Sequence, residues 1–529
     1  MYLVTADEMR EMDRETIETF GLPGRILMEN AGRLAARVLM NTFRGLSGRR
    51  VGVVAGRGNN GGDGFVVARY LKQKDIPVTV YLLCPRDKVQ GDAAANLKLL
   101  SPMAVPVIEI TDSSDFQARQ NEMQTMDLWV DAILGTGLKS DVKGFFKEVI
   151  EFLNSTNKPI FSVDIPSGLD SDTGQVRGLC IRSHTTATFA FPKIGHILYP
   201  GAAYTGRLEI VDIGIPAHIA ESVKPAQYLL TTDRVKSYLM PRKPDAHKGN
   251  TGHMLVVSGS TGKTGAAAMT ATSAVRAGAG LVTLGIPGRL NPILESLVVE
   301  AMTYPLPDTA QGFLDDSAYD PIMELVSSKR CLALGPGVGT APETARLVQR
   351  IVETCPGPMV IDADGLNNLA GHTDILQKTK APVVLTPHPG EMARLMDTTA
   401  QQIQKDRVQN ARDFAVRFNV HLVLKGAATV IAHPEGTVYV NTTGNSGMAS
   451  GGMGDVLTGL IAGFLTQGYS PEAACHLGVY VHGAAADTLA QKVGPFGYLA
   501  SEVMNAVPGE IKKLMDGSLP TEQADLKPF

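Results

Sequence analysis

The sequence predicts an α/β protein whose parallel sheets are divided between two domains. Its 529 residues exceed what one core usually serves, because domains mostly hold about 100 to 200 residues. Short, continuously apolar runs alternate with helical patterns in both halves, which is typical of parallel strands covered by helices on both faces. Hydrophobic residues make up 44% and charged residues 19% of the chain, the proportions of a globular protein.

In the first half, Thr5 and Glu8 have the spacing of a capping box, so a helix is expected to begin at Ala6. It should end near Gly21 and Pro23, and a second helix fits 26–42. The continuous apolar runs predict strands at 50–55, 77–83, 128–133, 159–164 and 208–213.

The pattern breaks at 216–244, a proline-rich stretch with room for one short helix at 233–239, and we place the domain junction there. The expected domains are 1–224 and 225–529. The second half predicts strands at 253–258, 280–285, 331–335, 359–362, 383–386, 421–424, 429–432 and 437–440. Its last helices are expected at 455–465, 471–491 and 499–515.

Composition disfavours several classes of protein. The net charge of −4, with no long run of one sign, argues against nucleic acid or an anionic membrane as the main partner. No secretory signal is visible, and the apolar stretch 265–285 is interrupted by Arg276, which favours a buried helix and strand over a membrane span. The five cysteines lack metal-ligand or redox spacing, which indicates reduced thiols of a cytoplasmic protein.

A glycine-rich segment, 56–64, follows the strand expected at 51–55, and a helix is expected at 65–72. Consecutive glycines let a backbone approach a ligand closely, and a helix N-terminus favours an anion such as pyrophosphate. Gly56, Gly58 and Gly61 match the dinucleotide fingerprint, but the next strand ends at Cys84-Pro85 without the acidic residue that binds ribose. A standard hydride-transfer site is therefore not expected; a tight turn without a ligand is the alternative.

Two further strand ends carry polar clusters, at 131–138 and 164–170. Ligands of open parallel sheets bind beyond the carboxyl ends of the strands, so the three segments imply one shared pocket. Asn60, Asp131 and Ser167 could hold a hard cation through oxygen atoms, although spacing does not identify the cation. Asp170 could equally well cap a helix.

In the second half, the run 444–455 precedes an apolar helix, and its glycines leave helix-start N–H groups free to bind phosphate. Asp455 falls in the first helical turn, where it could take a proton from a hydroxyl that attacks phosphorus, or could simply be a helix-favouring acid. The segment 259–264 is not a P-loop, because position 257 holds valine where the motif needs glycine.

Other strand ends support a phosphate site, namely 335–340, 362–365, 386–391 and 425–429. Lys425 could meet phosphate as a point charge, and His388 could contact substrate or cap a turn. His476 and His482 lie six apart on an expected helix and are more typical of packed or surface residues than of ligands.

Together these motifs resemble one family, the bifunctional NAD(P)H-hydrate repair enzymes. The matching segments are 28–32, 58–64, 131–137 and 164–168 in the first half, and 247–249, 335–339, 386–391, 425–426 and 444–455 in the second. The resemblance implies a Rossmann-like, three-layer epimerase domain followed by a ribokinase-like, ADP-dependent dehydratase domain. It also implies magnesium with the nucleotide, hydrated NADH and NADPH as substrates, and a homo-oligomer.

The resemblance assigns site residues position by position. The epimerase substrate residues are Asn59, Asn60, Gly61, Gly62, Asp63, Gly135, Thr136, Gly137, Leu138, Lys139, Ser140, Asp141 and Asp164, and potassium falls to Asn60, Asp131 and Ser167. The dehydratase substrate residues are Ala266, Gly337, His388 and Asp455. The residues that the resemblance assigns to ADP binding are Lys425, Gly426, Ala427, Ala428, Thr429, Asn445, Ser446, Gly447, Met448, Ala449, Ser450, Gly451, Gly452, Met453 and Gly454.

The resemblance and the phosphate motifs suggest one mechanism. Hydroxide is a poor leaving group and a phosphate ester a good one, so Asp455 would help the hydroxyl of the S-hydrate attack the terminal phosphate of ADP, leaving AMP. The first domain would rescue the other epimer, with Asp164 either transferring a proton or orienting the ring. A small-molecule kinase fused to a nucleotide-binding module, and a nucleotide sensor without turnover, are the alternatives. ADP and ATP are both possible donors.

Overall fold

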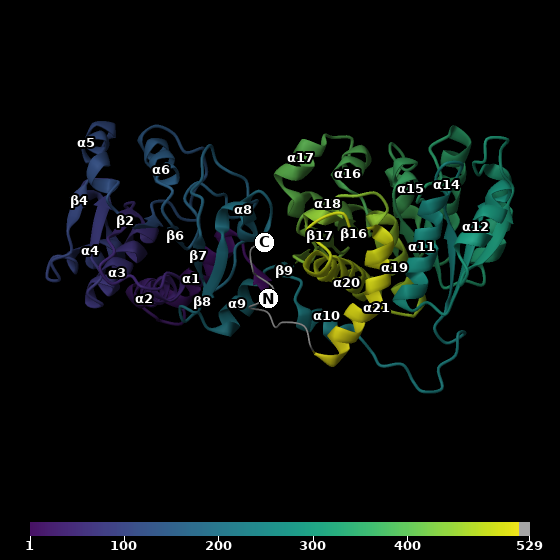
Figure 1. Cartoon of the computed structure of the whole chain (residues 1–529), viewed down its shortest axis with the longest axis horizontal. Helices are drawn as coiled ribbons and strands as arrows, with labels where there is room; N and C mark the ends of the chain where they lie inside the picture. The colour runs from purple at the N-terminus through teal and green to yellow at the C-terminus, as the bar shows by residue number, and fades with distance from the viewer. Residues whose placement is uncertain (518–529) are drawn as a thin grey trace. The chain divides into compact units, whose positions relative to one another are not determined.

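The computed structural model describes residues 1–517 and divides into two compact units, Met1–Gln227 and a second that begins at Tyr228 (Figure 1). The division falls inside the proline-rich stretch 216–244. Each unit has its own sheet with helices on both faces, so the predicted α/β class is confirmed.

The sheet of the first unit has the order β4-β3-β2-β5-β6-β7-β8, and all its pairings are parallel. Its strands are β2 (Val51–Ala55), β3 (Val78–Leu82), β4 (Val107–Glu109), β5 (Leu128–Ala132), β6 (Ile160–Val163), β7 (Thr185–Phe189) and β8 (Arg207–Val211). The chain runs outward from β2 to β4 and then returns to β5, so the strand order reverses between β2 and β5. Such a switch point opens a crevice at the carboxyl ends of the strands.

Two helical layers bury the faces of this sheet. One layer contains α2 (Gly24–Thr42), α3 (Asn59–Gln73) and α4 (Gly91–Lys98), and the other α5 (Ser113–Met123) and α6 (Phe145–Ser155). The remaining elements are β1 (Tyr2–Leu3), α1 (Ala6–Glu18), α7 (Ile194–Ile197), α8 (Gly201–Thr205) and α9 (Ala217–Val223). The predicted capping box is present, because the Glu8 N–H donates to Thr5 Oγ1 (3.2 Å) and the Thr5 N–H donates to Glu8 Oε2 (2.8 Å).

One predicted boundary is wrong in the first unit. The helix expected at 65–72 begins at Asn59, so the residues 59–64 are its first turns and not a loop. Two glycines permit this by close packing: a Cβ on Gly61 would lie 2.0 Å from the Gly56 carbonyl oxygen, and one on Gly64 would lie 2.6 Å from the Ala132 Cβ. The strands β4 and β7 were not predicted, because β4 is short and partly exposed and β7 is rich in threonine.

In the second unit the strands follow the order β9-β18-β17-β16-β15-β14-β13-β10-β11-β12. They are β9 (Gln227–Leu229), β10 (His253–Val257), β11 (Leu281–Pro287), β12 (Met302–Leu306), β13 (Cys331–Leu334), β14 (Met359–Ile361), β15 (Val383–Leu385), β16 (His421–Leu424), β17 (Thr429–Ala432) and β18 (Val438–Asn441). The strands from β10 to β16 pair in parallel, whereas β17 pairs antiparallel with both β16 and β18. The strands β9 and β12 were not predicted.

The main core of this unit joins one sheet face to α10 (Thr232–Tyr238), α11 (Thr264–Ala277), α19 (Met453–Thr466), α20 (Pro471–Lys492) and α21 (Ala500–Asp516). The other helices are α12 (Asn291–Leu297), α13 (Tyr319–Val326), α14 (Pro342–Thr354), α15 (Asp364–Asn367), α16 (Pro389–Leu395), α17 (Ala400–Lys405) and α18 (Arg407–Phe418). Short 3₁₀ helices occur in the first unit at η1 (Arg86–Lys88), and in the second at η2 (Gly288–Leu290), η3 (Asp316–Ala318), η4 (Thr373–Lys378) and η5 (Ser446–Met448).

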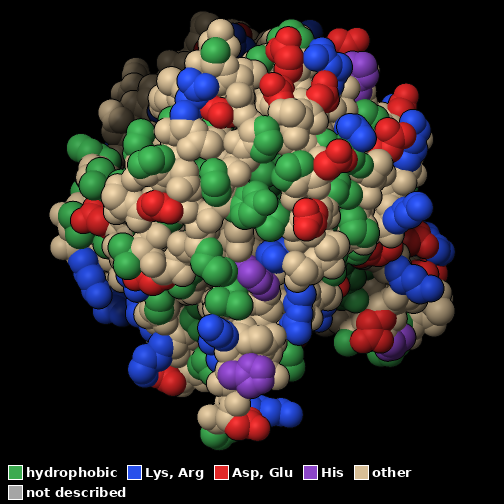
Figure 2. Space-filling view, turned by 90° about the vertical axis from the view of Figure 1, so that its right-hand side faces the viewer, with side chains coloured by type: hydrophobic (Ala, Val, Ile, Leu, Met, Phe, Trp, Pro, Cys, Tyr) green, Lys and Arg blue, Asp and Glu red, His purple; other side chains and the backbone are tan. Residues whose placement is uncertain are grey.

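One face of the second unit exposes apolar side chains. Figure 2 looks at the side of the second unit that carries α12 and shows hydrophobic side chains gathered between charged ones. Ile293 and Leu297 on α12, Val299 after it, and Met302 and Tyr304 on β12 are all exposed, Val299 by 83%. Within residues 1–517, no helix combines the length and apolar character that a membrane crossing requires.

Candidate active sites

The crevice of the first unit is built on close backbone contacts at the switch point. Gly56 ends β2, and a Cβ there would lie 2.1 Å from the Ile133 carbonyl oxygen just beyond β5. The N-terminus of α3 is therefore held against the ends of β2 and β5. This places Asn60 on α3 beside the residues that follow Asp131.

Asp131, Ser167 and Asn60 meet in one buried cluster, as the sequence predicts. The Asp131 carboxylate accepts hydrogen bonds from the Ser167 hydroxyl (2.5 Å), the Ser167 N–H (2.8 Å) and the Ser162 hydroxyl (2.8 Å). The Asn60 Nδ2 group donates to the Leu134 carbonyl oxygen (3.0 Å), which the Ser167 hydroxyl also approaches (3.2 Å). Burial raises the pKa of Asp131, against the lowering effect of these donors.

An unpartnered oxygen makes this cluster suited to a cation. Asn60 Oδ1 is buried and lacks a hydrogen-bond partner among the described residues. A buried amide oxygen without a donor is costly, and a bound cation would satisfy it. Together with the Leu134 carbonyl and the Asp131 carboxylate, it forms the oxygen-rich surroundings that hard cations prefer.

The loop after β5 begins at the same place. A Cβ on Gly135 would lie 3.3 Å from the Asn60 Cβ, so this glycine lies directly against α3. Farther along, Lys139, Ser140 and Asp141 are exposed. The structure thus brings the start of the 135–141 segment to the cluster and leaves its later part open to solvent.

Asp164 has a partner that the sequence analysis missed. Lys193 Nζ lies 2.6 Å from Asp164 Oδ1, and the lysine side chain is completely buried. Two more titratable residues influence this pair, Asp13 from α1 and His196 from α7, and neither was singled out. The only signal in the sequence is a lysine inside the otherwise apolar run 189–195.

Asp170 belongs to its own turn. It accepts hydrogen bonds from the Thr173 N–H (2.9 Å), the Thr173 hydroxyl (2.8 Å) and the Asp172 N–H (3.1 Å), and it pairs with Arg177. The hydrogen-bonding capacity of the Asp170 carboxylate is therefore satisfied within its own turn.

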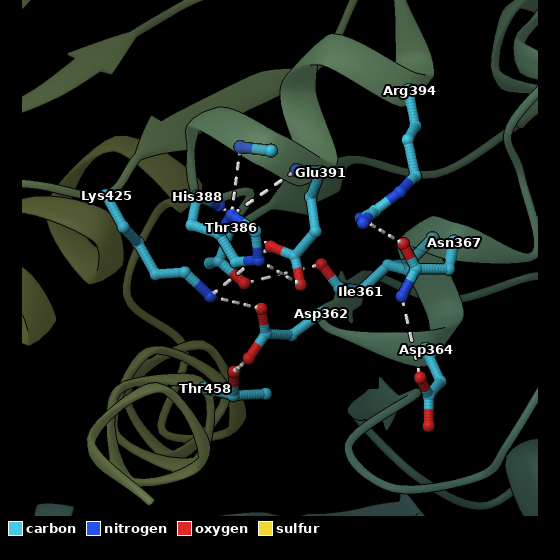
Figure 3. A network of polar contacts seen from close by, with 11 residues as sticks. Ile361, Asp362, Asp364, Asn367, Thr386, His388, Glu391, Arg394, Lys425 and Thr458 are labelled. Carbon is cyan, nitrogen blue, oxygen red and sulfur yellow. Dashed lines mark hydrogen bonds and ion pairs between the residues drawn. The ribbon is translucent and has the colours of Figure 1, made fainter. Parts of the chain in front are cut away.

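The second unit brings charged side chains from four elements together. Figure 3 shows Lys425, which follows β16, pointing at Asp362 at the end of β14. Lys425 Nζ lies 2.6 Å from Asp362 Oδ1 and 3.8 Å from Glu391 Oε2 on α16. The hydroxyl of Thr458 on α19 donates to the other Asp362 oxygen (2.7 Å).

Asp455 lies in the first turn of α19, as predicted, and the charged residues of this network shift its pKa. Burial and the nearby Asp362 carboxylate raise the pKa of Asp455 to about 6, while Lys425 lowers it. A Cβ on the preceding residue, Gly454, would lie 3.4 Å from Lys425 Nζ. Asp455 is therefore ionised near neutral pH yet close enough to its pKa to accept a proton.

Ala266 and Gly337 lie beside Asp455. The Thr270 hydroxyl lies 2.9 Å from the Ala266 carbonyl oxygen and 3.3 Å from that of Asp455. A Cβ on Gly337, whose φ is +70°, would lie 3.3 Å from the Ala266 Cβ. Ala266, Gly337 and Asp455, three of the predicted dehydratase substrate residues, therefore lie close together.

His388 lies next to the same network, at the N-terminus of α16. Its Nδ1 accepts from the Gly390 N–H (3.0 Å) and the Glu391 N–H (3.4 Å), so it caps the helix, and its ring is half exposed. Burial raises the pKa of Glu391, against the lowering effect of Lys425.

Three side chains that the sequence analysis missed brace the predicted nucleotide segments. Buried Arg407 donates to the carbonyl oxygens of Ala427 (2.6 Å), Ala428 (3.0 Å) and Leu424 (3.0 Å). Asp487 accepts from the Gly444 N–H (2.8 Å) and from Asn445 Nδ2 (2.9 Å), and the Tyr498 hydroxyl donates to Asn445 Oδ1 (2.6 Å). These contacts hold both predicted nucleotide segments in place and leave the N-terminus of α19 facing the site.

The two histidines of α20 are packed residues. His476 Nε2 lies 3.0 Å from His433 Nε2, and His433 Nδ1 lies 2.8 Å from His421 Nδ1. His482 is buried in the same helix, near Lys425. Across residues 1–517, His, Cys, Asp and Glu side chains form no group of three placed to hold a metal ion.

Comparison with known proteins covers both units. A family model described as NAD(P)H-hydrate dehydratase matches residues 254–509, and one described as YjeF-related protein N-terminus matches residues 24–195. A bifunctional NAD(P)H-hydrate repair enzyme of Moorella thermoacetica is 44% identical over 97% of this chain and 97% of its own length. The enzyme of that name from Thermofilum pendens is 37% identical over 98% and 97%.

A solved structure also matches the second unit. The ADP/ATP-dependent NAD(P)H-hydrate dehydratase of Bacillus subtilis, crystallised with ATP and Mg²⁺, is 30% identical and aligns over 54% of this chain and 98% of its own, with a TM-score of 0.48. The two-unit fold, the two polar sites and the near-complete coverage by bifunctional relatives agree. The chain belongs to the family of bifunctional NAD(P)H-hydrate repair enzymes.

Proposed function

We propose that this protein repairs hydrated NADH and NADPH with two activities on one chain. The first unit interconverts the R and S hydrates, and the second dehydrates the S-hydrate at the expense of ADP, giving AMP and phosphate. The observation that carries the proposal is the presence of two separate polar sites, each at the strand ends of its own sheet. Each site contains a carboxylate whose ionisation is set by a buried lysine or by neighbouring acids.

In the second unit, Asp455 would take the proton of the substrate hydroxyl as that oxygen attacks the terminal phosphate. The N–H groups at the start of α19 would stabilise the charge that develops on phosphorus. Lys425, held by Asp362 and Glu391, would place its positive charge beside the phosphates. The ester then loses inorganic phosphate from one ring carbon and a proton from the adjacent carbon to water, which restores the double bond of the dihydronicotinamide ring.

Magnesium bound with the nucleotide would shield the phosphate charge. The carboxylates of Asp362 and Glu391 are hard oxygen donors beside the proposed phosphate site, so the residues fit such an ion. The described side chains do not form a complete metal site by themselves, so nucleotide and water oxygens would supply the other ligands.

In the first unit, we propose potassium at Asn60, Asp131 and Ser167, because Asn60 Oδ1 is buried without a donor. The ion would supply a positive charge beside the buried Asp131 carboxylate. The substrate would lie along the N-terminus of α3 and the 135–141 segment, with Asp164 accepting a proton.

The test uses the purified chain and a mixture of both hydrate epimers. The return of dihydronicotinamide absorbance is followed with ADP, with ATP and with neither. Nucleotide-dependent recovery of the whole mixture supports both activities and identifies the phosphate donor. Recovery that stops when one epimer is exhausted contradicts the epimerase assignment. A stable phosphorylated product without recovery would favour the small-molecule kinase instead.

We also propose that the chain forms a homo-oligomer and acts in the cytoplasm. Support for the first comes from the exposed apolar residues on α12 and β12, since apolar groups that gather on a surface favour contact with another protein. Support for the second comes from the five cysteines, which are all free thiols. Sedimentation velocity of the wild type and of V299E tests the oligomer: the variant should shift toward monomer.

A further inference from the structure

We propose that Lys193 is a positioning residue of the epimerase site, which holds Asp164 as an ionised carboxylate with one oxygen left for the substrate. The inference rests on the proposed epimerase function of the first unit and adds a residue to it. Three observations carry it: the contacts of Lys193, the way both residues are anchored, and the acidic residues around them.

Every hydrogen-bonding direction of the Lys193 ammonium is occupied. Its Nζ contacts Asp164 Oδ1 (2.6 Å), the Thr188 hydroxyl (2.9 Å) and the Phe189 carbonyl oxygen (3.2 Å). An ammonium has three protons to donate, and here each has an acceptor. The side chain is 0% exposed, so this charge is available only to its immediate neighbours.

The Asp164 carboxylate is held on one side only. Lys193, the Thr188 hydroxyl (3.1 Å) and the Phe189 N–H (3.3 Å) all donate to Oδ1. The side chain is 15% exposed, and no hydrogen bond from the described residues ends on Oδ2. Lys193 therefore orients the group and leaves its second oxygen for a ligand.

Both residues are fixed by the backbone. Asp164 follows β6 with a left-handed φ of +62°, and its N–H donates to the Ala187 carbonyl oxygen (2.8 Å). Lys193 immediately precedes α7, and its N–H donates to His196 Nδ1 (3.1 Å). A left-handed aspartate is a strained conformation that persists only where the surroundings enforce it, which is common at functional sites.

Acidic neighbours explain why a lysine is needed. Asp63 on α3 and Asp13 on α1 both interact with Asp164. Burial, followed by the charge of Asp164, raises the pKa of Asp63 well above its usual range, and burial raises that of Asp13 to about 6. Burial would also raise the pKa of Asp164, but Lys193 outweighs it, so the pKa of Asp164 is lowered.

His196 does not replace this charge. Burial and the nearby Lys193 lower the pKa of His196 to about 3, so the imidazole is neutral at neutral pH. Among the described groups that lower the pKa of Asp164, Lys193 has the largest effect, ahead of His196 and the Phe189 N–H. Of the three aspartates, only Asp164 has a lowered pKa, so Lys193 favours Asp164 as the base.

The test compares K193M, K193R and D164N with the wild type, and uses the surface variant K147M as a matched lysine control. Epimerisation of the purified R-hydrate is followed by chromatography from pH 4.5 to 9. Dehydration of the S-hydrate by the same preparations reports whether the rest of the chain is intact.

We expect K193M to lower kcat for epimerisation at pH 7 by about 100-fold or more, the size of a general-base contribution, with KM changed far less. The acidic limb of its pH profile should move to higher pH. K193R should recover part of the rate and keep the limb near its wild-type position. The double variant K193M/D164N should be no slower than D164N, because both residues act through one group.

Wild-type epimerisation by K193M, or an unchanged acidic limb, would overturn the proposal. So would a loss of rate that is equal at every pH and accompanied by loss of dehydration, since that indicates a structural role. If K193M does not fold, the K193R profile decides: a shifted limb in spite of the retained charge contradicts the proposal. Absence of epimerisation by the wild type would overturn the proposed function itself.

Discussion

Two lysine–aspartate pairs, one in each unit, have the same short contact and different surroundings. Lys193–Asp164 and Lys425–Asp362 both measure 2.6 Å at the carboxyl end of a parallel sheet. Lys193 is fully buried, whereas the Lys425 side chain is 19% exposed. In the first unit the paired aspartate is the proposed base. In the second the base is a neighbour, Asp455, and the lysine remains accessible to a ligand.

The difference shows how the same kind of ion pair can support proton transfer in one site and phosphate binding in the other. A buried lysine whose three ammonium protons are all hydrogen-bonded stabilises the charge of its partner and keeps a carboxylate ionised. A partly exposed lysine held between two acids remains a cation and can approach phosphate. The acid left unpaired beside the second pair has a raised pKa, which suits proton transfer near neutral pH.

The largest expected effect separates the two sites. D455N removes the proposed base, so dehydration of the S-hydrate should fall by about 10² to 10⁴, while ADP binding and epimerisation are retained. Initial rates with ADP and calorimetric titration of ADP measure this. The control is D374N, an exposed aspartate of η4 that belongs to neither proposed site. Full dehydratase activity in D455N would refute the assignment.

The two activities should also differ in pH dependence. The pKa of Asp455 is raised to about 6, so the dehydratase rate should fall about tenfold for each pH unit below 6 as this base is protonated. The pKa of Asp164 is lowered, so epimerisation should persist in that range. Parallel profiles from pH 4.5 to 8 measure both. Coincident acidic limbs would contradict the comparison.

Removal of potassium should affect only the first unit. Exchange of K⁺ for a large organic cation leaves Asn60 Oδ1 without a partner, and we expect a drop in epimerisation of about tenfold, as for loss of a supporting group around an ion. Dehydration in the same buffer is the control. N60A should lose the dependence on K⁺. An equal response of both activities to K⁺ would count against a site in the first unit.

The last difference concerns stability at low pH. Burial lowers the pKa of His421 and His482 to about 4 and that of His476 well below its usual value. As the pH falls from about 6.5 toward 4, the unfolded chain binds protons that the folded second unit does not. The unfolding free energy should then fall by about 1.4 kcal/mol per histidine and pH unit.

Urea titrations at pH 7.5 and 5.5 measure this difference between the units. Trp129 is the only tryptophan and lies in the first unit, so its fluorescence follows that unit alone, while circular dichroism follows both. The transition of the second unit should shift further to lower urea at pH 5.5 than that of the first, in which His196 is the buried histidine with a lowered pKa. A shift confined to the tryptophan signal would contradict the assignment to the buried histidines.

Local patterns were sufficient for much of the fold and for the outline of both sites. The Thr5 capping box and the continuous apolar runs are properties of neighbouring residues, so their helix and strands could be predicted. Asn60, Asp131 and Ser167 could be grouped because the carboxyl ends of parallel strands meet at one edge. Asp455 could be placed in a first helical turn because an apolar helix follows its glycine run.

Other features arose only when the chain was folded. Residues 59–64 form helix rather than loop, because Gly61 and Gly64 let α3 pack directly on the ends of β2 and β5, which no local pattern encodes. Lys193 is 29 residues from Asp164, and Arg407 about 20 from the loop that it braces. The sequence by itself determined which residues could carry charge and phosphate chemistry. Only the tertiary structure decided which of them meet, because burial and pairing depend on the path of the whole chain.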